Sequence, residues 1–218
     1  MKISNRLLTI ASFIEDNSFV MDVGADHGQL EVYFCDHRNL NGLIAVENKV
    51  GPYSILKNAL QGTDAECVLG DGIKQIRDEV DTVVIAGMGG NLIVDILTND
   101  VSKLKNIKHI VVDAHRDNEL VRREIVKLGY RIDAEKIVYE NKKYYFVISF
   151  KKGSAKYSDV QYEFGTCHKD PLFKQFKEFE LNKLKQELAK SSEAKTPNKI
   201  KIEKLKAKIV RLENYGND

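Results

Sequence analysis

An early glycine-containing turn combines acidic side chains with a histidine. Asp22 ends an apolar run, and Gly24 and Gly28 then frame Asp26 and His27 in the pattern D-x-G-x-x-x-G. A dinucleotide-binding turn has a further glycine at this place, which lets the backbone approach a pyrophosphate at a helix N-terminus. The negative charge of Asp26 would repel a diphosphate and attract an ammonium or sulfonium group. The spacing therefore predicts a binding turn for a cationic small molecule.

S-adenosylmethionine (SAM) carries both of these cationic groups, and its amino-acid end normally lies over a turn of this kind. The sequence therefore predicts a SAM site, with cofactor contacts from Asp22, Gly24, Asp26, His27 and Gly28. The competing interpretation is that Asp26 and His27 only cap the helix that follows the turn.

Two further acidic residues follow the next two apolar runs. Glu47 stands nineteen residues after Gly28, where the carboxylate of a nucleotide-binding α/β fold accepts hydrogen bonds from ribose hydroxyls. This carboxylate would serve a nicotinamide dinucleotide as well as SAM. Asp71 lies between two glycines and is placed to bind the exocyclic amine of an adenine, although a plain turn competes with this interpretation. The predicted cofactor site is completed by Glu47, Asn48, Gly70, Asp71 and Gly72.

Three glycines follow the fourth apolar run, in the sequence Gly87-Met88-Gly89-Gly90-Asn91. Glycines at the C-terminal end of a strand leave bare backbone at the edge where ligands bind to parallel sheets. We predict that Gly87, Met88 and Gly89 belong to the catalytic centre, to which Gly87 also brings a cofactor contact. Asp26 is predicted to join this centre, and Gly90 and Asn91 are expected to contact the substrate. A pure packing role for the glycines is the alternative.

Apolar runs and helix-length segments alternate along the first half of the chain. The runs are Phe19–Val23, Leu43–Val46, Cys67–Leu69, Thr82–Ala86 and His109–Val112, and residues 4–16 before them have a helical period. Strands that alternate with helices are typical of a parallel sheet covered by helices. Such a sheet would bring the polar residues that follow each run to one edge.

The pattern changes after the fifth run. Asp117 is placed to cap a helix that stops at Gly129. Two strand-like runs, Tyr130–Tyr139 and Tyr144–Lys151, are then joined by four residues as a hairpin. A parallel sheet that ends in a hairpin is the layout of class I SAM-dependent methyltransferases. We therefore predict an α/β fold, with a Rossmann-like sheet and a terminal β-hairpin, over residues 1–153.

Residues 154–218 are predicted to form a separate antiparallel helical hairpin, or coiled coil. Residues 152–170 have the composition of a loop. A first helix, from about residue 171 to 190, has an apolar stripe that includes Phe179, and a second carries Ile202, Leu205, Ile209 and Leu212 at heptad spacing. From residue 151 onward the chain has 16 Lys and Arg against 10 Asp and Glu, whereas the earlier part has 18 against 22. A basic arm can bind a polyanion, although solvated lysines are an ordinary feature of surface helices.

The chain resembles the bacterial tRNA (adenine-22-N1)-methyltransferase family, called TrmK, over nearly its whole length. The resemblance rests on Arg6-Leu7, DVGADH at 22–27, GPY at 51–53, GDG at 70–72, AGMGG at 86–90 and YEFG at 162–165. It implies SAM as cofactor, an adenine in the D-arm of tRNA as target, and a C-terminal coiled-coil arm that helps to hold the tRNA. The chain departs from the family where Asp113-Ala114-His115-Arg116 replaces a pattern like Gln-Pro-Asn, and where Gly28 replaces the usual alanine.

Adenine N1 already offers a lone pair, so its methylation needs no general base and produces a cation. Catalysis would then consist mainly of in-line positioning, and carbonyls of the glycine loop, with Asp26 or Asp113, could stabilise the developing charge. The target base must leave its stack to reach the site. Substrate contacts are expected from Asp113, His115 and Arg116 and, in the arm, from Lys183, Lys185, Lys201, Lys204 and Lys208.

The composition is that of an ordinary soluble protein, with 43% hydrophobic and 30% charged residues. The three cysteines have no C-x-x-C spacing, which favours buried, inert thiols in a reducing compartment and predicts no metal site. No apolar stretch approaches the length of a membrane span. We predict a cytoplasmic protein that acts as a monomer, with a dimer through the helical hairpin as the alternative.

Three other functions fit parts of the pattern. A nicotinamide-dependent oxidoreductase would share Glu47 but not the glycine spacing of the first turn. A non-catalytic RNA-binding module would have no need of Asp22, Glu47 and Asp71 in series. A SAM-dependent methyltransferase acting on another RNA site or on a small molecule would keep the fold, but the sequence shows no substrate-covering insertion before the helical arm.

Overall fold

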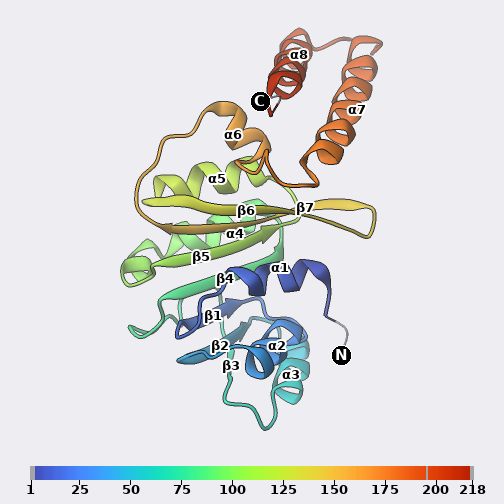
Figure 1. The fold of residues 1–218 in the computed structure, drawn as a ribbon. Coiled ribbons are helices and arrows are strands. Elements are labelled where there is room, and N and C mark those ends of the chain that lie inside the picture. The colour runs from blue at the N-terminus through green and yellow to red at the C-terminus, as the bar shows by residue number, and fades with distance from the viewer. Residues whose placement is uncertain (1–2, 195, 217–218) are drawn as a thin grey trace. The chain divides into compact units, whose positions relative to one another are not determined.

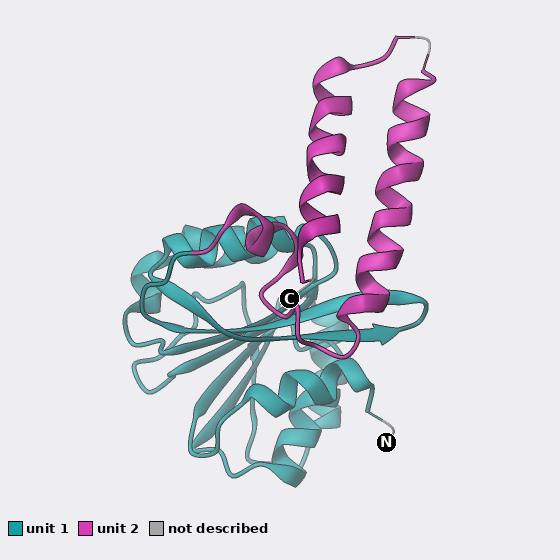
Figure 2. Cartoon of the chain, turned by 45° about the horizontal axis from the view of Figure 1, so that its top comes forward, with its two compact units in different colours: residues 1–156 teal, residues 157–218 magenta. Residues whose placement is uncertain are grey.

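The computed structural model describes residues 3–194 and 196–216. Figure 2 shows the two compact units into which the chain divides, residues 1–156 and 157–218. The boundary predicted from the sequence, between residues 153 and 154, lies close to this division. Each unit buries apolar side chains of its own.

Within the described residues, the first unit contains a seven-stranded sheet with the order β3-β2-β1-β4-β5-β7-β6 (Figure 1). The strands are β1 (Phe19–Val23), β2 (Gly42–Glu47), β3 (Glu66–Leu69), β4 (Thr82–Met88), β5 (His109–Ala114), β6 (Tyr130–Glu140) and β7 (Lys143–Lys152). Strands β1 to β5 are parallel, and β7 pairs with both β5 and β6 in the antiparallel direction. The predicted parallel sheet with a terminal hairpin is therefore confirmed.

Helices cover both faces of this sheet. They are α1 (Asn5–Phe13), α2 (Gln29–His37), α3 (Val50–Ala59), α4 (Gly90–Asn99) and α5 (Asn118–Lys127), with a short 3-10 helix η1 (Val101–Lys105). Val147 of β7 packs in the cluster formed by α1 and α2, whereas the adjacent Phe146 contacts the Arg122 guanidinium of α5. Because successive side chains of a strand point to opposite faces, α1 and α2 lie on one face and α5 on the other.

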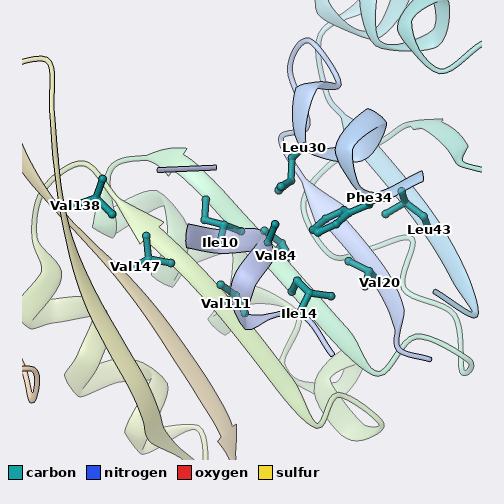
Figure 3. Close-up of a cluster of buried hydrophobic side chains, with 11 residues drawn as sticks. Ile10, Ile14, Val20, Leu30, Phe34, Leu43, Val84, Val111, Val138 and Val147 are labelled. Atoms are coloured by element: carbon teal, nitrogen blue, oxygen red, sulfur yellow. The ribbon is translucent and has the colours of Figure 1, made fainter. Parts of the chain in front are cut away.

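A cluster of buried hydrophobic side chains lies between the sheet and the first two helices (Figure 3). Ile10 of α1 and Ile14, the residue directly after this helix, belong to the cluster, and α2 contributes Leu30 and Phe34, which are one helical turn apart. They meet one apolar residue from each of six strands, namely Val20, Leu43, Val84, Val111, Val138 and Val147. This packing fixes the first residues of both helices beside the carboxyl ends of the parallel strands.

Two predicted turns differ in detail from the structure. The hairpin connection is shorter than the four residues predicted, because only Asn141 and Lys142 lie between β6 and β7, with φ angles of 50° and 62°. Such a pair is typical of a type I′ turn. Asp117 occupies the N-cap position of α5, but its φ is 61° and its side chain makes no capping hydrogen bond. The predicted capping role of Asp117 is therefore wrong, since its carboxylate instead accepts from Asn91 Nδ2 at 3.0 Å.

The second unit contains α6 (Asp159–Phe164), α7 (Phe173–Ser192) and α8 (Lys199–Asn214). Helix α6 lies inside the segment predicted as a loop and begins with a capping box between Ser158 and Gln161. Helices α7 and α8 pack on each other and confirm the helical hairpin (Figure 2). Their buried residues are Phe173, Phe176 and Leu184 on α7, and Leu205, Ile209 and Leu212 on α8. Phe179 was predicted to join this apolar stripe and is instead 47% exposed.

Candidate active site

A cavity of about 550 Å³ opens at the carboxyl ends of β1, β2, β3 and β4, all within the first unit. Eleven of the predicted site residues line it: Asp22, Gly24, Asp26, His27, Glu47, Asn48, Gly70, Asp71, Gly72, Gly87 and Met88. Parallel strands bring these residues together, although they are spread over more than sixty positions of the sequence. The volume is in the range of small-molecule and cofactor sites.

The glycine turn after β1 is shaped by a close approach of Met88. Gly24 has a φ of 82°, and a Cβ atom added there would lie 2.1 Å from Cε of Met88. The Gly24 N–H donates to the carbonyl of Val46 at 2.8 Å, which ties the turn to the neighbouring strand. The positive φ favours glycine at this position, and without a side chain there Met88 can lie against the turn. The turn and Met88 therefore form one continuous wall of the cavity.

Asp22 lies at the base of this wall, beside a second buried acid. Asp22 is 4% exposed and Glu31 of α2 is fully buried. Burial raises the pKa of Asp22, and burial together with the Asp22 charge raises the pKa of Glu31 well above its usual range. The Glu31 carboxyl oxygens have no hydrogen bond of normal geometry within the described residues. The larger pKa shift at Glu31 means that a proton on this pair resides more readily on Glu31 than on Asp22.

Glu47 ends β2 with its side chain held in a fixed orientation. The residue is 7% exposed, and its Oε1 accepts from the backbone N–H groups of Asn48 and Lys49, both at 2.9 Å. These two donors account for one carboxylate oxygen. Oε2 has no hydrogen bond to the described residues, and Glu47 lines the cavity. This geometry suits a carboxylate that accepts hydrogen bonds from a ligand hydroxyl pair.

The remaining acidic residues of the cavity are exposed. The side chains of Asp26 and Asp71 are 65% and 66% exposed, and each lies near a nitrogen-bearing side chain. His27 Nε2 lies 3.7 Å from Asp26, and Lys74 Nζ lies 2.5 Å from Asp71. Gly28 is the N-cap of α2 and no side chain caps the helix, so the structure does not support the capping interpretation of Asp26 and His27. Gly28 itself does not line the cavity.

The glycine loop after β4 divides into two parts. Gly87 and Met88 line the cavity, whereas Gly89, Gly90 and Asn91 lie outside it. A Cβ atom on Gly90 would lie 2.8 Å from the carbonyl oxygen of Arg116, to which the Gly90 N–H donates at 3.1 Å. The later glycine therefore permits a close backbone contact between the start of α4 and the turn after β5. Gly90 therefore has the packing role that the sequence analysis gave as the alternative to a substrate contact.

A second cluster lies beside the cavity at the end of β5. Arg6 of α1 lines the cavity, and its Nη1 forms an ion pair with Asp113, whose side chain is completely buried. Burial raises the pKa of Asp113, and the Arg6 guanidinium opposes this shift. The Arg6 guanidinium lies 5.3 Å from the ring centre of Tyr145, against which the His115 ring packs edge-on at 5.8 Å.

This cluster contains Asp113 and His115, which were predicted to contact substrate. The sequence assigned no role to its other two members, Arg6 and Tyr145. His115 and Arg116 are exposed at the cavity edge of the sheet, whereas Asp113 acts on the cavity through Arg6. Arg6 was noted only within a family motif. Tyr145 was not singled out, because a tyrosine in an alternating strand looks like any other packed residue. Glu31 was also missed; its signal was a charged residue three positions before the buried Phe34 of the same helix.

Ion pairs within the second unit hold three of the five predicted arm lysines: Lys183 with Glu180, Lys185 with Glu213, and Lys201 with Glu187. These lysine side chains nevertheless stay more than half exposed. Lys208 lies over the ring of Phe164 at 5.2 Å. Lys204 is exposed and has no ion pair within the described residues. The arm therefore presents lysines in several electrostatic environments.

The described residues contain no group of His, Cys, Asp and Glu side chains that could hold a metal ion. None of the helices in residues 3–194 and 196–216 is both long and apolar enough to cross a membrane. None of the three cysteines forms a disulfide: Cys167 is buried and Cys67 half-buried, but Cys35 is exposed. The prediction of buried thiols is therefore wrong for Cys35, which lies on the solvent side of α2.

Comparison with known proteins identifies the kind of domain and its relatives. Residues 3–148 match a family model described as a methyltransferase domain. The chain is 30% identical over 195 residues to the tRNA (adenine(22)-N(1))-methyltransferase of Bacillus subtilis (strain 168), a match that covers 86% of this chain and 82% of the relative.

Solved structures agree with this relationship. The B. subtilis m1A22 tRNA methyltransferase TrmK has a TM-score of 0.88 at 27% identity, with 97% of each chain covered. A Streptococcus pneumoniae protein, proposed to be a tRNA (m1A22) methyltransferase and solved in complex with S-adenosyl-L-methionine, has a TM-score of 0.87 at 27% identity. That match covers 97% of this chain and 98% of the other.

The sheet order, the cavity at the strand ends and the matching domain define a Rossmann-like methyltransferase. The chain belongs to the tRNA (adenine(22)-N(1))-methyltransferase family. The predicted fold class, enzyme class and family are confirmed. The alternative of a nicotinamide-dependent oxidoreductase is excluded by this membership, as the charged glycine turn had indicated.

Proposed function

We propose that this protein transfers the methyl group of SAM to N1 of adenine 22 in tRNA. The observation that carries the proposal is the order of Asp22, Glu47 and Asp71 around one cavity, at the ends of β1, β2 and β3. This order matches the successive parts of the cofactor. Family membership supports both the SAM cofactor and the tRNA target.

The cofactor fits the cavity by its charge and its hydrogen-bonding groups. The amino-acid end would lie over the turn from Asp22 to Gly28, where Asp22 and Asp26 supply negative charge for the ammonium and sulfonium groups. The ribose hydroxyls would donate to Glu47, whose orientation is already fixed by two backbone donors. The adenine would lie near Asp71, between Gly70 and Gly72. Bound in this way, SAM presents its methyl group toward Gly87 and Met88.

The protein's contribution to the reaction is positioning and charge. N1 of adenine attacks through its own lone pair, so no side chain has to remove a proton. In-line positioning of the two reactants can supply about 7–11 kcal/mol at best. Carbonyl groups of the loop at Gly87 and the carboxylate of Asp26 would stabilise the positive charge that moves onto the ring. Asp113 contributes less to this than the sequence suggested, because its charge is compensated by Arg6.

The tRNA substrate requires extrusion of the target base and contacts beyond the cavity. N1 lies on the Watson–Crick edge, so a paired or stacked adenine must turn out to reach the methyl group. The exposed lysines of α7 and α8 would bind phosphates of the D-arm region without reading sequence. We propose that one copy of the chain carries out the reaction. Because tRNA is the substrate, we place the activity in the cytoplasm.

The test is methylation of unmodified tRNA by the full chain with SAM, followed by mass spectrometry of the nucleosides. We expect 1-methyladenosine with tRNA that has adenine at position 22, and none when that adenine is replaced by guanine. Methylation that survives this replacement would assign the enzyme to another RNA site. No methyl transfer to any tRNA would favour the non-catalytic RNA-binding module.

The cofactor site is tested by Glu47→Ala and its control Glu66→Ala. Loss of a buried charged hydrogen bond should weaken SAM binding by about 1–3 kcal/mol, or roughly 5- to 150-fold, in calorimetry. Glu66 is the first residue of the adjacent strand β3. It therefore lies at the amino ends of the parallel strands, away from the cavity, where it pairs with Arg77. Its replacement should leave SAM affinity unchanged. Equal affinities of wild type and Glu47→Ala would remove Glu47 from the site.

A further inference from the structure

We propose that the Arg6 guanidinium, backed by the ring of Tyr145, is the platform on which the extruded target adenine stacks. This inference rests on the proposed function, since it names the residues that receive the base. Neither residue was assigned a role by the sequence. Both lie in the first unit. Arg6 lines the cavity, and its partner Asp113 pairs in the sheet with Ala86, the residue before Gly87.

The guanidinium plane is fixed from two directions. Its central carbon lies 5.3 Å from the centre of the Tyr145 ring, within the range of a cation–π contact. Its edge is held by the ion pair from Nη1 to Oδ2 of Asp113. Tyr145 is supported in turn by the edge of the His115 ring at 5.8 Å. The Tyr145 ring therefore lies on one side of the guanidinium, and Arg6 borders the cavity.

A planar cation suits a purine that has been turned out of its helix. Extruded bases are commonly bound by stacking on aromatic rings or on arginine guanidinium planes. Stacking leaves the Watson–Crick edge of the base exposed, so N1 stays accessible to the methyl group. A lysine at position 6 would keep the positive charge but could not provide a flat surface. The chemistry of the platform therefore requires arginine.

Asp113 explains how an arginine can border a site for a cationic cofactor. The sulfonium of SAM and the methylated adenine product are both positively charged, and an uncompensated arginine nearby would repel them. Asp113 carries the compensating charge, and its side chain is completely buried beneath Arg6. Arg6 thus offers a flat surface and hydrogen-bond donors with little net charge. Asp113 is a positioning residue that acts on the substrate through Arg6.

The experiment measures RNA binding rather than catalysis. Two RNAs are compared in the presence of S-adenosylhomocysteine, one with adenine at position 22 and one with an abasic site there. The ratio of their dissociation constants is determined for the wild type and for Arg6→Lys by fluorescence anisotropy. Costs of extruding the base are common to both proteins and cancel in this cycle. The preference for the RNA with adenine over the abasic RNA should be about 5- to 150-fold smaller in Arg6→Lys than in the wild type, because a stacking contact is lost.

Two further variants separate stacking from a general structural effect. Tyr145→Leu removes the ring behind Arg6 and should reduce the adenine preference, whereas Tyr145→Phe should retain it. Arg77→Lys is the matched control, because Arg77 pairs with the exposed Glu66 and does not line the cavity. SAM affinity and melting temperature are measured for every variant, to show that each is folded.

The outcomes are decisive for this site. An adenine preference that is the same in wild type and Arg6→Lys, with both proteins folded, overturns the platform. A loss of preference in Arg77→Lys of the same size would also overturn it, because the effect would not be local. If Arg6→Lys loses the preference but the wild type methylates no tRNA, the platform stands and the proposed function fails.

Discussion

Two arginine–carboxylate pairs join a helix to the same sheet, but only one of them reaches the cavity. Arg122 of α5 binds Glu135 of β6 through Nε and Nη2, at 2.9 and 2.5 Å, and the side chains are 1% and 0% exposed. Arg6 of α1 binds Asp113 of β5, and here the arginine side chain is 23% exposed while the acid is completely buried. Each arginine also lies over an aromatic ring, at 5.0 Å from Phe146 or 5.3 Å from Tyr145.

The difference in exposure separates a structural role from a functional one. The Arg122–Glu135 pair is sealed, so its interactions can only fix α5 to the hairpin. In the Arg6–Asp113 pair only the carboxylate is completely buried. The guanidinium is partly exposed and remains accessible to a ligand. The sequence does not distinguish the two arginines, because exposure is set by which neighbours the fold brings to each. Burial of the acid and partial exposure of the arginine together mark the functional pair.

The largest stability effect is expected at the sealed pair. Arg122→Ala leaves the Glu135 carboxylate buried without its partner, which should lower the free energy of unfolding by about 3–5 kcal/mol. Urea denaturation measures this change. The control is Arg123→Ala on the same helix, where the partly exposed pair with Glu119 should contribute less than about 1 kcal/mol. The double variant Arg122→Met with Glu135→Leu should recover most of the loss, because it removes both charges. A cost for Arg122→Ala as small as that of the control would contradict the assignment.

A smaller and pH-dependent effect is expected at the open pair. Arg6→Ala should cost about 1–3 kcal/mol at neutral pH, because Asp113 loses its partner. The pKa of Asp113 is raised by burial and held down by Arg6, so removal of Arg6 raises it further. A raised pKa in the folded state means stability that is present at low pH and lost as the pH rises through that value. The deficit of Arg6→Ala relative to wild type should therefore shrink between pH 7 and pH 5.

Denaturation at both pH values measures the deficit of Arg6→Ala, and Arg77→Ala serves as the control. Arg77 pairs with Glu66 on the surface, so its replacement should cost the same small amount at both pH values. A deficit for Arg6→Ala that grows toward pH 5 would show that Asp113 does not take up a proton when its partner is removed.

The buried acids Asp22 and Glu31 extend the comparison to a pair without an arginine. The pKa of Glu31 is raised well above its usual range by burial and by the charge of Asp22. Its stabilisation is therefore complete below the unfolded pKa and is lost as the pH rises through the folded one. Glu31→Gln keeps a hydrogen-bond donor beside Asp22 but cannot ionise. We expect the variant to match wild type within about 1 kcal/mol at pH 6 and to lose less stability between pH 6 and pH 9.

Thermal denaturation across this range checks the prediction for Glu31. The matched control is Glu124→Gln, because Glu124 pairs with Lys127 on the outer side of α5. Its pH profile should follow that of the wild type. Parallel profiles for wild type and Glu31→Gln would show that Glu31 is already ionised in the folded protein.

Residues that follow regular patterns were predictable from the sequence. Alternating apolar runs predicted the parallel sheet, and the sheet in turn brought Asp22, Glu47 and Asp71 to one cavity, as expected. Side chains that break a pattern were harder to predict. Glu31 counts as polar in any helical period, yet the fold buries it completely. Helix α6 is too short to show a helical period of apolar residues. The only sequence signal for its start is the capping-box spacing of Ser158 and Gln161.

Tertiary contacts accounted for the remaining differences. Gly90 was predicted to contact substrate because glycines at strand ends often do, but the backbone of Arg116 occupies the space beside it. Asp117 stands at the right position to cap α5, yet its carboxylate is taken by Asn91. In both cases the competing partner is more than twenty residues away in the sequence. Local propensity alone could not have identified it.

The smallest stability effects are expected for exposed pairs, and α8 offers a matched comparison. Lys201 is paired with Glu187 at 2.9 Å, whereas Lys204 has no ion pair within the described residues. Lys201→Ala should change the free energy of unfolding by less than about 1 kcal/mol, and Lys204→Ala should change it even less. The order reverses for tRNA. Lys204 can bind a phosphate without giving up a partner, and each phosphate contact contributes roughly 0.7–0.9 to the salt slope of log K.

Binding of tRNA to wild type, Lys201→Ala and Lys204→Ala is therefore compared over a series of salt concentrations. Lys204→Ala should lower the slope by nearly one full contact. Lys201→Ala should lower it less, because Lys201 must first leave Glu187. Lys127→Ala is the control on α5, where an exposed lysine pairs with Glu124 outside the arm. Equal slopes for wild type and both arm variants would mean that these lysines do not touch the RNA. The effects of Lys201→Ala and Lys204→Ala on stability and on RNA binding would then no longer be ranked in opposite order. Whether a surface lysine forms an ion pair within the arm would then not affect its contribution to tRNA binding.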